Sequence, residues 1–236
     1  MRILLFVVLL VSCSVSMADE IRLGVHNFPP YITVDSAGHC SGEAIEITRD
    51  ILQNDTIKVN TVCATAARLY KMLQSGEVDL TINIKHTKAL PNDVSFVEPP
   101  YAQLTLTLLT HGAAIAREKH LTIAAIRGFD YHGQRHLLSE QGYSFTDLPD
   151  SLSAVELFVK GRSSALLTYE GPFIYYLQQH NLPFAKHYQR RVIETIDTHY
   201  VISAASAHQD YIRQTLQHYA TINTLSYFSR QAISTD

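Results

Sequence analysis

Positive charge gathers where a short strand is expected to meet a loop, in the segment INIKHTKALPNDVSFVEPPY (residues 82–101). The stretch VDLTINIK alternates apolar and polar residues with period two, so its polar face carries Asn83 and Lys85. Lys88 follows three residues later. Amide and ammonium groups at a strand end suit the ionised end of a small solute. We take these three residues as candidate ligand contacts. The alternative is a solvated loop whose lysines keep a strand edge from pairing.

Two tyrosines and an arginine are further candidates. Tyr31 and Tyr101 each follow a proline, and an aromatic ring at such a turn either stacks on a ligand or packs in the core. Arg68 lies in the first turn of an expected helix. Its guanidinium either points toward a ligand or forms a surface ion pair worth under about 1 kcal/mol. Both interpretations stay open for each residue.

Common catalytic signatures are missing from the sequence. It contains no G-x-S-x-G, H-E-x-x-H, C-x-x-C, P-loop or G-x-G-x-x-G pattern. His132 and His136 have the spacing of a helical metal pair, but no cysteine or third histidine lies nearby, and Gly133 weakens the helix under His132. We therefore expect no enzyme, no metal site and no cofactor.

The first 18 residues, MRILLFVVLLVSCSVSMA, are typical of a secretory signal peptide. Arg2 precedes an apolar run, and small residues stand at Ser16 and Ala18. The run is too short to span a bilayer, which takes about 20 residues. Residues 10–13 also resemble the lipobox of bacterial lipoproteins, and cleavage there would leave Cys13 lipidated. We expect export to the periplasm, with both cleavage routes open.

Charge and cysteine content narrow the partners and the compartment. The chain has 19 Lys and Arg against 22 Asp and Glu, a net charge of −3 and no long basic run, which argues against nucleic acid. Removal of the leader leaves two cysteines, Cys40 and Cys63. An oxidising compartment favours one disulfide between them, and the alternative is two half-buried thiols that never meet.

Strands and helices are expected to alternate. Strands at 21–26, 57–64 and 78–85 enclose helices at 41–53 and 65–76, and this β-α-β-α-β order predicts an α/β protein with a largely parallel sheet. Ligands of such sheets sit beyond the carboxyl ends of the strands. The second half repeats the plan, with expected strands 121–128 and 164–169, helices 133–142, 150–161 and 172–180, and a helical tail 208–231 that packs on the first lobe.

The order of these elements resembles that of the bacterial extracellular solute-binding proteins, family 3. The family's opening pattern is matched by LGVHNFPPYITVDSAGHCSGEAIEI, and its middle pattern by RLYKMLQSGEVDLTINIKHTKALPNDVSFVEPPY. The second-lobe pattern is matched more loosely by IAAIRGFDYHG and LFVKGRSSALLTYE. Together these segments cover nearly the whole mature chain. The resemblance implies a two-lobed type II periplasmic binding fold, each lobe a mixed, mostly parallel sheet flanked by helices.

The resemblance also exposes departures from an amino-acid site in the first lobe. Family members carry an arginine three residues after the loop threonine, where it clamps the ligand's α-carboxylate. Counting from Thr87 places Leu90 there, so the clamp is missing. Lysine cannot copy the bidentate geometry of arginine. We expect Lys85, with help from Lys88 or Arg68, to supply positive charge for an anionic group.

Departures recur in the second lobe. Family members often present a Gly-Ser/Thr pair at a helix N-terminus, a place suited to anions. Here Phe129 replaces the hydroxyl residue, with Arg127 before the glycine and Asp130 after the ring. In family members, the acid that binds the ligand's amino group ends a second-lobe strand. The matching position in this sequence is Tyr169, which is not an acid. Glu170 takes the role if the strand end shifts by one residue. The alternative for Glu170 is a position beside a helix cap.

The resemblance thus implies a monomeric periplasmic receptor with lobe 1 at residues 19–110 and 204–236 and lobe 2 at 111–203. Hinges at 110–113 and 202–205 would close the lobes on a small polar, anionic or zwitterionic solute. The closed form would be presented to an ABC permease or a membrane sensor. Two alternatives remain, a dehydratase-like enzyme that uses Glu170 and a sensor that binds no solute.

Overall fold

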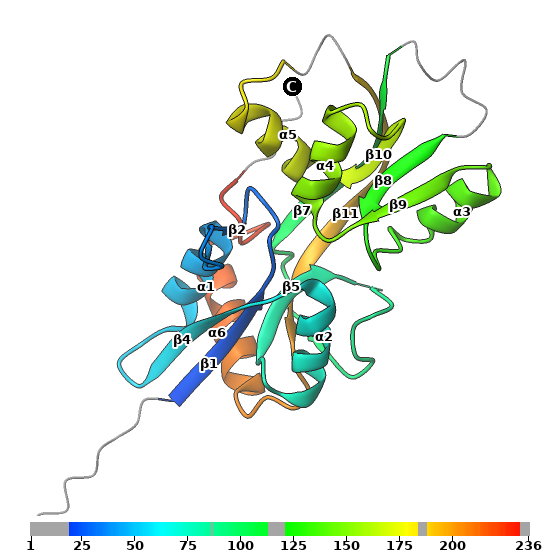
Figure 1. Cartoon of the computed structure of the whole chain (residues 1–236). Helices are drawn as coiled ribbons and strands as arrows, with labels where there is room; N and C mark the ends of the chain where they lie inside the picture. Colours follow the sequence, from blue (N-terminus) through cyan, green and yellow to red (C-terminus); the bar gives the residue numbers. More distant parts are fainter. Residues whose placement is uncertain (1–18, 86, 113–120, 184–187, 232–236) are drawn as a thin grey trace, which may run out of the picture.

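The computed structural model describes residues 19–85, 87–112, 121–183 and 188–231. Strands and helices alternate along them, and the predicted α/β class is confirmed. Figure 1 shows two groups of elements joined by long strands that run through the middle of the molecule. The leader with Cys13, and position 113 of the expected hinge, lie outside the described residues.

The main sheet contains nine strands. They are β1 (Asp19–Val25), β4 (Ile57–Cys63), β5 (Leu80–Ile84), β6 (Ser95–Phe96), β7 (Ala102–His111), β8 (Thr122–Ile126), β9 (Ser144–Leu148), β10 (Ala165–Tyr169) and β11 (Tyr188–Ile202). Their order is β4-β1-β5-β11-β7-β10-β8-β9, and β6 also pairs with β11. A separate hairpin is formed by β2 (Thr33–Val34) and β3 (Cys40–Ser41).

Pairing in the main sheet is parallel at the flanks and antiparallel in the centre. β1 pairs in parallel with β4 and β5, and β8 pairs in parallel with β9 and β10. The central strands β7 and β11 run antiparallel over the whole of β7, from His111 opposite Tyr188 to Ala102 opposite Thr198. We call β1, β4 and β5 with their helices the first half, and β8, β9 and β10 with theirs the second half.

The helices lie close to their predicted positions. They are α1 (Glu43–Leu52), α2 (Ala66–Ser75), α3 (Gln134–Glu140), α4 (Ser151–Val159), α5 (Glu170–Gln179) and α6 (Gln209–Ile222). Gly76 ends α2 in the left-handed conformation (φ 75°), as its position in the sequence predicts. The expected tail helix is shorter than predicted, since α6 ends at Ile222 and Thr224 takes a left-handed φ of 50°.

Both halves bury apolar residues on the two faces of the sheet. In the first half, α1 and α6 cover one face and α2 covers the other with Leu69 and Leu73. The tail helix therefore packs on the first half, as predicted. In the second half, Leu166 of β10 faces α4 and α5, whereas its neighbour Leu167 belongs to the opposite core with Leu138 of α3. This alternation follows from the two-residue period of a strand.

Strand pairing bears on the lobe division expected from the sequence. Residues 106–110 of β7 pair with β10, so this part of β7 lies in the sheet of the second half. Residues 198–202 of β11 pair with β5 of the first half. The pairing with β7 shifts register between Val192 and Glu194. We propose that the halves exchange between residues 102–106 and 193–198, inside the strands, in place of the predicted division at 110 and 203.

The hairpin β2–β3 is tied to the edge of the sheet. A disulfide joins Cys40 of β3 to Cys63 at the end of β4. Asp35 adds a local anchor, because its Oδ1 accepts hydrogen bonds from the backbone N–H groups of Ala37 and His39. Among the helices of the described residues, none is long and apolar enough to cross a membrane.

A buried carboxylate connects four segments of the first half. Asp79, 1% exposed, accepts hydrogen bonds from the backbone N–H of Arg22 (2.8 Å) and from its Nε (3.0 Å). It also accepts one from the Ser206 hydroxyl (2.7 Å), beyond the end of β11. The same guanidinium donates to the Gly76 carbonyl at the end of α2. Asp79 thereby fixes β1, α2 and β11 around the start of β5.

Replacing Asp79 tests this anchor. We expect Asp79→Asn to lower the free energy of unfolding by about 2–3 kcal/mol, because a charge-assisted network loses its charge at a buried position. Asp50→Asn is the matched control. Asp50 lies on the surface, 3.9 Å from Arg230, and its loss should cost less than about 0.5 kcal/mol. Urea unfolding of both variants measures the difference, and equal values would contradict the anchor.

Candidate ligand-binding cleft

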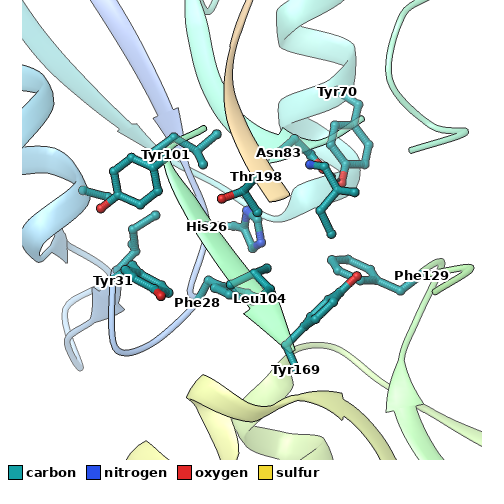
Figure 2. Close-up of a pocket in the computed structure, with 14 residues that line it drawn as sticks. His26, Phe28, Tyr31, Tyr70, Asn83, Tyr101, Leu104, Phe129, Tyr169 and Thr198 are labelled. Atoms are coloured by element: carbon teal, nitrogen blue, oxygen red, sulfur yellow. Dashed lines mark hydrogen bonds between the residues drawn. The ribbon is translucent and has the colours of Figure 1, made fainter. Parts of the chain in front are cut away.

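A cleft lies between the two halves at the carboxyl ends of β1, β5, β8 and β10. Its deeper part, which we call the inner pocket, takes residues from both halves, as Figure 2 shows. The lining residues of the inner pocket are His26, Phe28, Tyr31, Ile32, Ala44, Tyr70, Ile82, Asn83, Ile84, Tyr101, Leu104, Phe129, Tyr169 and Thr198. This is where ligands of parallel α/β sheets are expected.

The halves touch across the inner pocket. The ring centroids of Phe28 and Tyr169 lie 5.8 Å apart, and those of His26 and Phe129 lie 6.4 Å apart. At the rim, a Cβ on Gly171 would lie 3.0 Å from Cδ of Pro30. The remaining cavity is about 50 Å³, whereas small-molecule sites occupy about 300–1,000 Å³. The inner pocket is therefore too small for a whole solute in this conformation.

His26 brings an uncharged polar group into this apolar space. It follows the last residue of β1, and Figure 2 shows its ring near the centre of the cleft. Burial lowers the pKa of His26 from 6.5 to about 4, so the imidazole is neutral at pH 7. Its Nε2 is buried without a hydrogen-bond partner in the described structure. A buried nitrogen without a partner is costly unless a ligand or water satisfies it.

Two further polar side chains line the inner pocket. The hydroxyl of Tyr31 is buried and has no partner among the described residues, and burial raises its pKa to about 12. Asn83 is held in place instead: its Nδ2 donates to the Tyr70 hydroxyl (3.1 Å), and its Oδ1 accepts from the Thr87 hydroxyl (3.0 Å). The inner wall thus offers fixed, uncharged hydrogen-bonding groups.

A second cavity, which we call the outer hollow, adjoins the inner pocket. Its volume is about 290 Å³, and Tyr70, Asn83 and Tyr169 are among the residues that line both. Lys88 and Asp130 face each other here, with Nζ 3.0 Å from Oδ2. Lys88 belongs to the first half and Asp130 to the second, so opposite charges meet at the mouth of the cleft.

Of the nine ligand contacts predicted from the sequence, three line the inner pocket and two line the outer hollow. Tyr31, Asn83 and Tyr101 lie in the first group. Lys88 lies in the outer hollow with Asp130, and Asn83 also reaches it. The structure therefore brings these five residues together in one cleft, although their contact with a solute stays a prediction.

Lys85 lies elsewhere, contrary to the prediction that it supplies charge to the cleft. The strand alternation ends at Ile84, and Lys85 forms an ion pair with Glu98. Both line a back hollow of about 330 Å³, together with His199. Thr198 lines the inner pocket, whereas its neighbour His199 lines the back hollow.

The remaining predicted contacts also lie outside the inner pocket and the outer hollow. Arg68 and Arg127 are exposed, on the first turn of α2 and just after β8. Glu170 is buried and forms an ion pair with Arg190 of β11. The strand shift required for Glu170 does not occur, since β10 ends at Tyr169 and it is this ring that lines the cleft. Leu90, at the clamp position, packs with Leu69 and Leu73.

His132 and His136, which have the spacing of a helical metal pair, do not share a helical face. His132 precedes α3 with a left-handed φ of 54° and pairs with Glu194, while His136 pairs with Glu140. Within the described ranges, no cluster of three or more histidine, cysteine or acidic residues is arranged to hold a metal ion.

Sequence reasoning missed much of the aromatic wall, notably His26, Phe28 and Tyr70, and it noted Phe129 only as the replacement of a hydroxyl residue. A search for charge passed over them, because an uncharged ring in a loop looks like a packing residue. The sequence did contain a signal. His26 and Phe28 stand directly between a strand and a pair of prolines, at the strand end where a ligand is expected.

Comparison with known proteins matches this architecture. The model of the bacterial extracellular solute-binding proteins, family 3, matches residues 21–219. The chain belongs to this family. A search of curated protein sequences found no match to this family 3 chain.

Solved structures with the same fold are distant in sequence. An ancestral arginine-binding protein bound to arginine has a TM-score of 0.70 and 16% identity over 88% of the family 3 chain and 95% of its own. A histidine kinase sensor domain with similarity to periplasmic binding proteins has a TM-score of 0.68 and 17% identity over 88% and 92%.

The third comparison is an ancestral amino acid-binding protein, AncCDT-1, described as a precursor of cyclohexadienyl dehydratase. Its TM-score is 0.66, with 16% identity over 89% of this chain and 92% of its own. The two-lobed type II periplasmic binding fold predicted for the family 3 chain is confirmed by these likenesses. At sequence identities this low, these likenesses show a shared fold and do not show a shared ligand or activity.

The neutral state of His26 predicts a pH dependence of stability. The unfolded chain takes up a proton at His26 between pH 6.5 and about 4, and the folded family 3 protein does not. The part of the free energy of unfolding that depends on a neutral His26 is fully present above pH 6.5 and is lost as pH falls toward 4. We expect His26→Phe to lose less stability than wild type between about pH 7.5 and about pH 4.5 in urea unfolding.

The exposed His218 supplies the control. His218→Phe should follow the wild-type pH profile of unfolding. A His26→Phe profile that also follows wild type would show that the buried imidazole is not the group responsible.

Proposed function

We propose that this family 3 protein is a periplasmic receptor that captures a small solute between its halves and closes over it. The observation that carries the proposal is the inner pocket, where rings from both halves meet around a buried polar atom without a partner, Nε2 of His26. Such a site binds by enclosure, and no covalent step is required. Movement within β7 and β11 would open it.

Membership of an extracellular family supports export and a periplasmic location. We propose that the mature monomer presents its closed form to an ABC permease or to a membrane sensor. Structural likeness to an arginine-binding protein and to a kinase sensor domain is compatible with either partner. The signal peptide, with either cleavage route, remains part of this proposal.

An anionic or zwitterionic solute remains the proposed ligand. Its ionised groups, however, cannot be bound by Lys85, which lies outside the inner pocket and the outer hollow. The described lining of the inner pocket has no lysine, arginine, aspartate or glutamate. Lys88 and Asp130 in the outer hollow are the charged pair within reach of a bound solute. We propose that they contact its ionised groups.

An enzyme on the same scaffold is the less favoured function. The likeness to a dehydratase precursor concerns the fold. Glu170, the acid expected to act in such an enzyme, is paired with Arg190 and lies outside the inner pocket and the outer hollow. The geometry therefore supports binding over catalysis.

A metabolite panel tests the receptor directly. We expect at least one small anionic or zwitterionic compound, present at about 100 times its Kd, to add about 2.7 kcal/mol to stability. Differential scanning fluorimetry measures the shift in Tm, and mass spectrometry should recover the compound unchanged. Conversion to product would establish the enzyme instead, and a panel without any stabilising compound would favour a sensor that binds no solute.

Closure has its own test at Gly171. A side chain there meets Pro30 and the Pro29 carbonyl only when the cleft is closed. We expect Gly171→Val to raise the Kd of the most stabilising compound about tenfold or more, which corresponds to about 1.4 kcal/mol. Gly112→Val is the control, since a Cβ at Gly112 has no atom within 4 Å. Equal affinities in calorimetry would contradict closure over the solute.

A further inference from the structure

We infer that the solute is a small aromatic acid or aromatic zwitterion whose uncharged ring enters the inner pocket and whose ionised end stays in the outer hollow. Within the inner pocket, Nε2 of His26 binds a hydroxyl, N–H or carbonyl group carried by the ring. This inference rests on the proposed receptor function and adds the class of the solute, its orientation and the residue that selects it.

Once the halves separate enough to admit a solute, the walls of the inner pocket suit a ring better than an ionised group. Its described walls include Phe28 and Tyr31 from the first half and Phe129 and Tyr169 from the second. Aromatic faces and edges pack well against another ring. A carboxylate or ammonium placed among them would lose its hydration without gaining a partner of opposite charge, which is strongly unfavourable. The part of the solute that reaches this depth is therefore uncharged and flat.

His26 gives the inner pocket a specific hydrogen bond. The nearest rings around it, Phe28 and Phe129, meet it in edge contacts and cannot satisfy Nε2. A neutral imidazole nitrogen either donates or accepts according to its tautomer. A site that holds a buried polar group rejects an analogue unable to pair with it. His26 should therefore favour a ring with a polar substituent over the unsubstituted ring.

The outer hollow receives the ionised end. It shares Tyr70, Asn83 and Tyr169 with the inner pocket, so one molecule would reach both once these side chains part. Lys88 would bind a carboxylate, and Asp130 an ammonium group where the solute has one. Their mutual ion pair is largely exposed on the lysine side. An exposed pair is weak, so exchanging it for contacts with a solute costs little.

The core position of Leu90 supports this orientation. The residue packs against Leu69 and Leu73, away from the cleft, so nothing at that point holds a carboxylate. Lys88 and Asp130 in the outer hollow would therefore bind the ionised end, and the ring would occupy the inner pocket.

Matched pairs of compounds test the class of solute on the mature protein. We expect 4-hydroxyphenylacetate, phenylacetate, L-tyrosine or L-phenylalanine to raise Tm. Cyclohexylacetate and L-arginine, which keep the charged end without an aromatic ring, should not. The hydroxylated member of each aromatic pair should bind about tenfold more tightly, as expected for one hydrogen bond to a buried group.

Two variants separate the ring contact from the charge contact. His26→Phe keeps a ring of similar size and should abolish the preference for the hydroxylated compound, with the affinity for phenylacetate kept within about threefold. Lys88→Met should weaken both phenylacetates by a similar factor of about five to ten, because it removes the partner of the carboxylate they share. Calorimetry of wild type and of His26→Phe, each with 4-hydroxyphenylacetate and with phenylacetate, completes a double-mutant cycle for the hydroxyl contact.

The outcomes distinguish this inference from the receptor function. Binding of L-arginine or cyclohexylacetate in preference to the aromatic compounds would overturn the inference and leave the receptor intact. A hydroxyl preference that survives in His26→Phe would overturn the role of His26. If neither these compounds nor the broader metabolite panel stabilises the protein, the receptor function itself fails.

Discussion

The pairing of β7 with β11 is the constraint on which the rest of the structure depends. β7 pairs with β10 of the second half, and β11 continues past β7 to pair with β5 of the first half, so the two strands join the sheets of both halves. The carboxyl ends of β1 and β5 on one side and of β8 and β10 on the other therefore face a common space. A cleft between the halves follows from this arrangement, whatever solute it holds.

Asp79 and Glu170 show how charge is used away from the cleft. Asp79 connects β1, α2 and β11 in the first half, and Glu170 connects the start of α5 to Arg190 of β11 in the second. Both carboxylates are buried and paired within their own half. Each half is therefore braced internally by a buried carboxylate. The inner pocket, in contrast, is lined by described residues without charged side chains.

Local patterns predicted most of the elements. The period of VDLTINIK gave β5, Gly76 marked the end of α2, and the tail helix was placed on the correct half. The strands β7 and β9 were not assigned. The long strand β11 was not assigned either, because it is held by distant partners: residues 188–198 pair with β7, and residues 198–202 pair with β5. Such long-range pairing leaves little trace in a short window of sequence.

The candidate site was harder to predict than the fold. Tyr31, Asn83, Tyr101, Lys88 and Asp130 do lie together in the cleft. Lys85 does not, because side-chain alternation holds only while the strand continues, and the chain turns after Ile84. His26 was overlooked, and Phe129 was noted only as the replacement of a hydroxyl residue, because their role depends on a ring brought from the other half. A single sequence does not display that partner.

The Cys40–Cys63 bond has a further consequence for the compartment in which the protein works. Residues 26–32, which carry the first half's share of the aromatic wall, run between β1 and the hairpin held by this bond. One end of that loop is fixed by the sheet and the other by a sulfur link. Thiol reductants would free the second end of this loop. The placement of Phe28 and Tyr31 in the cleft would then depend on an oxidising environment.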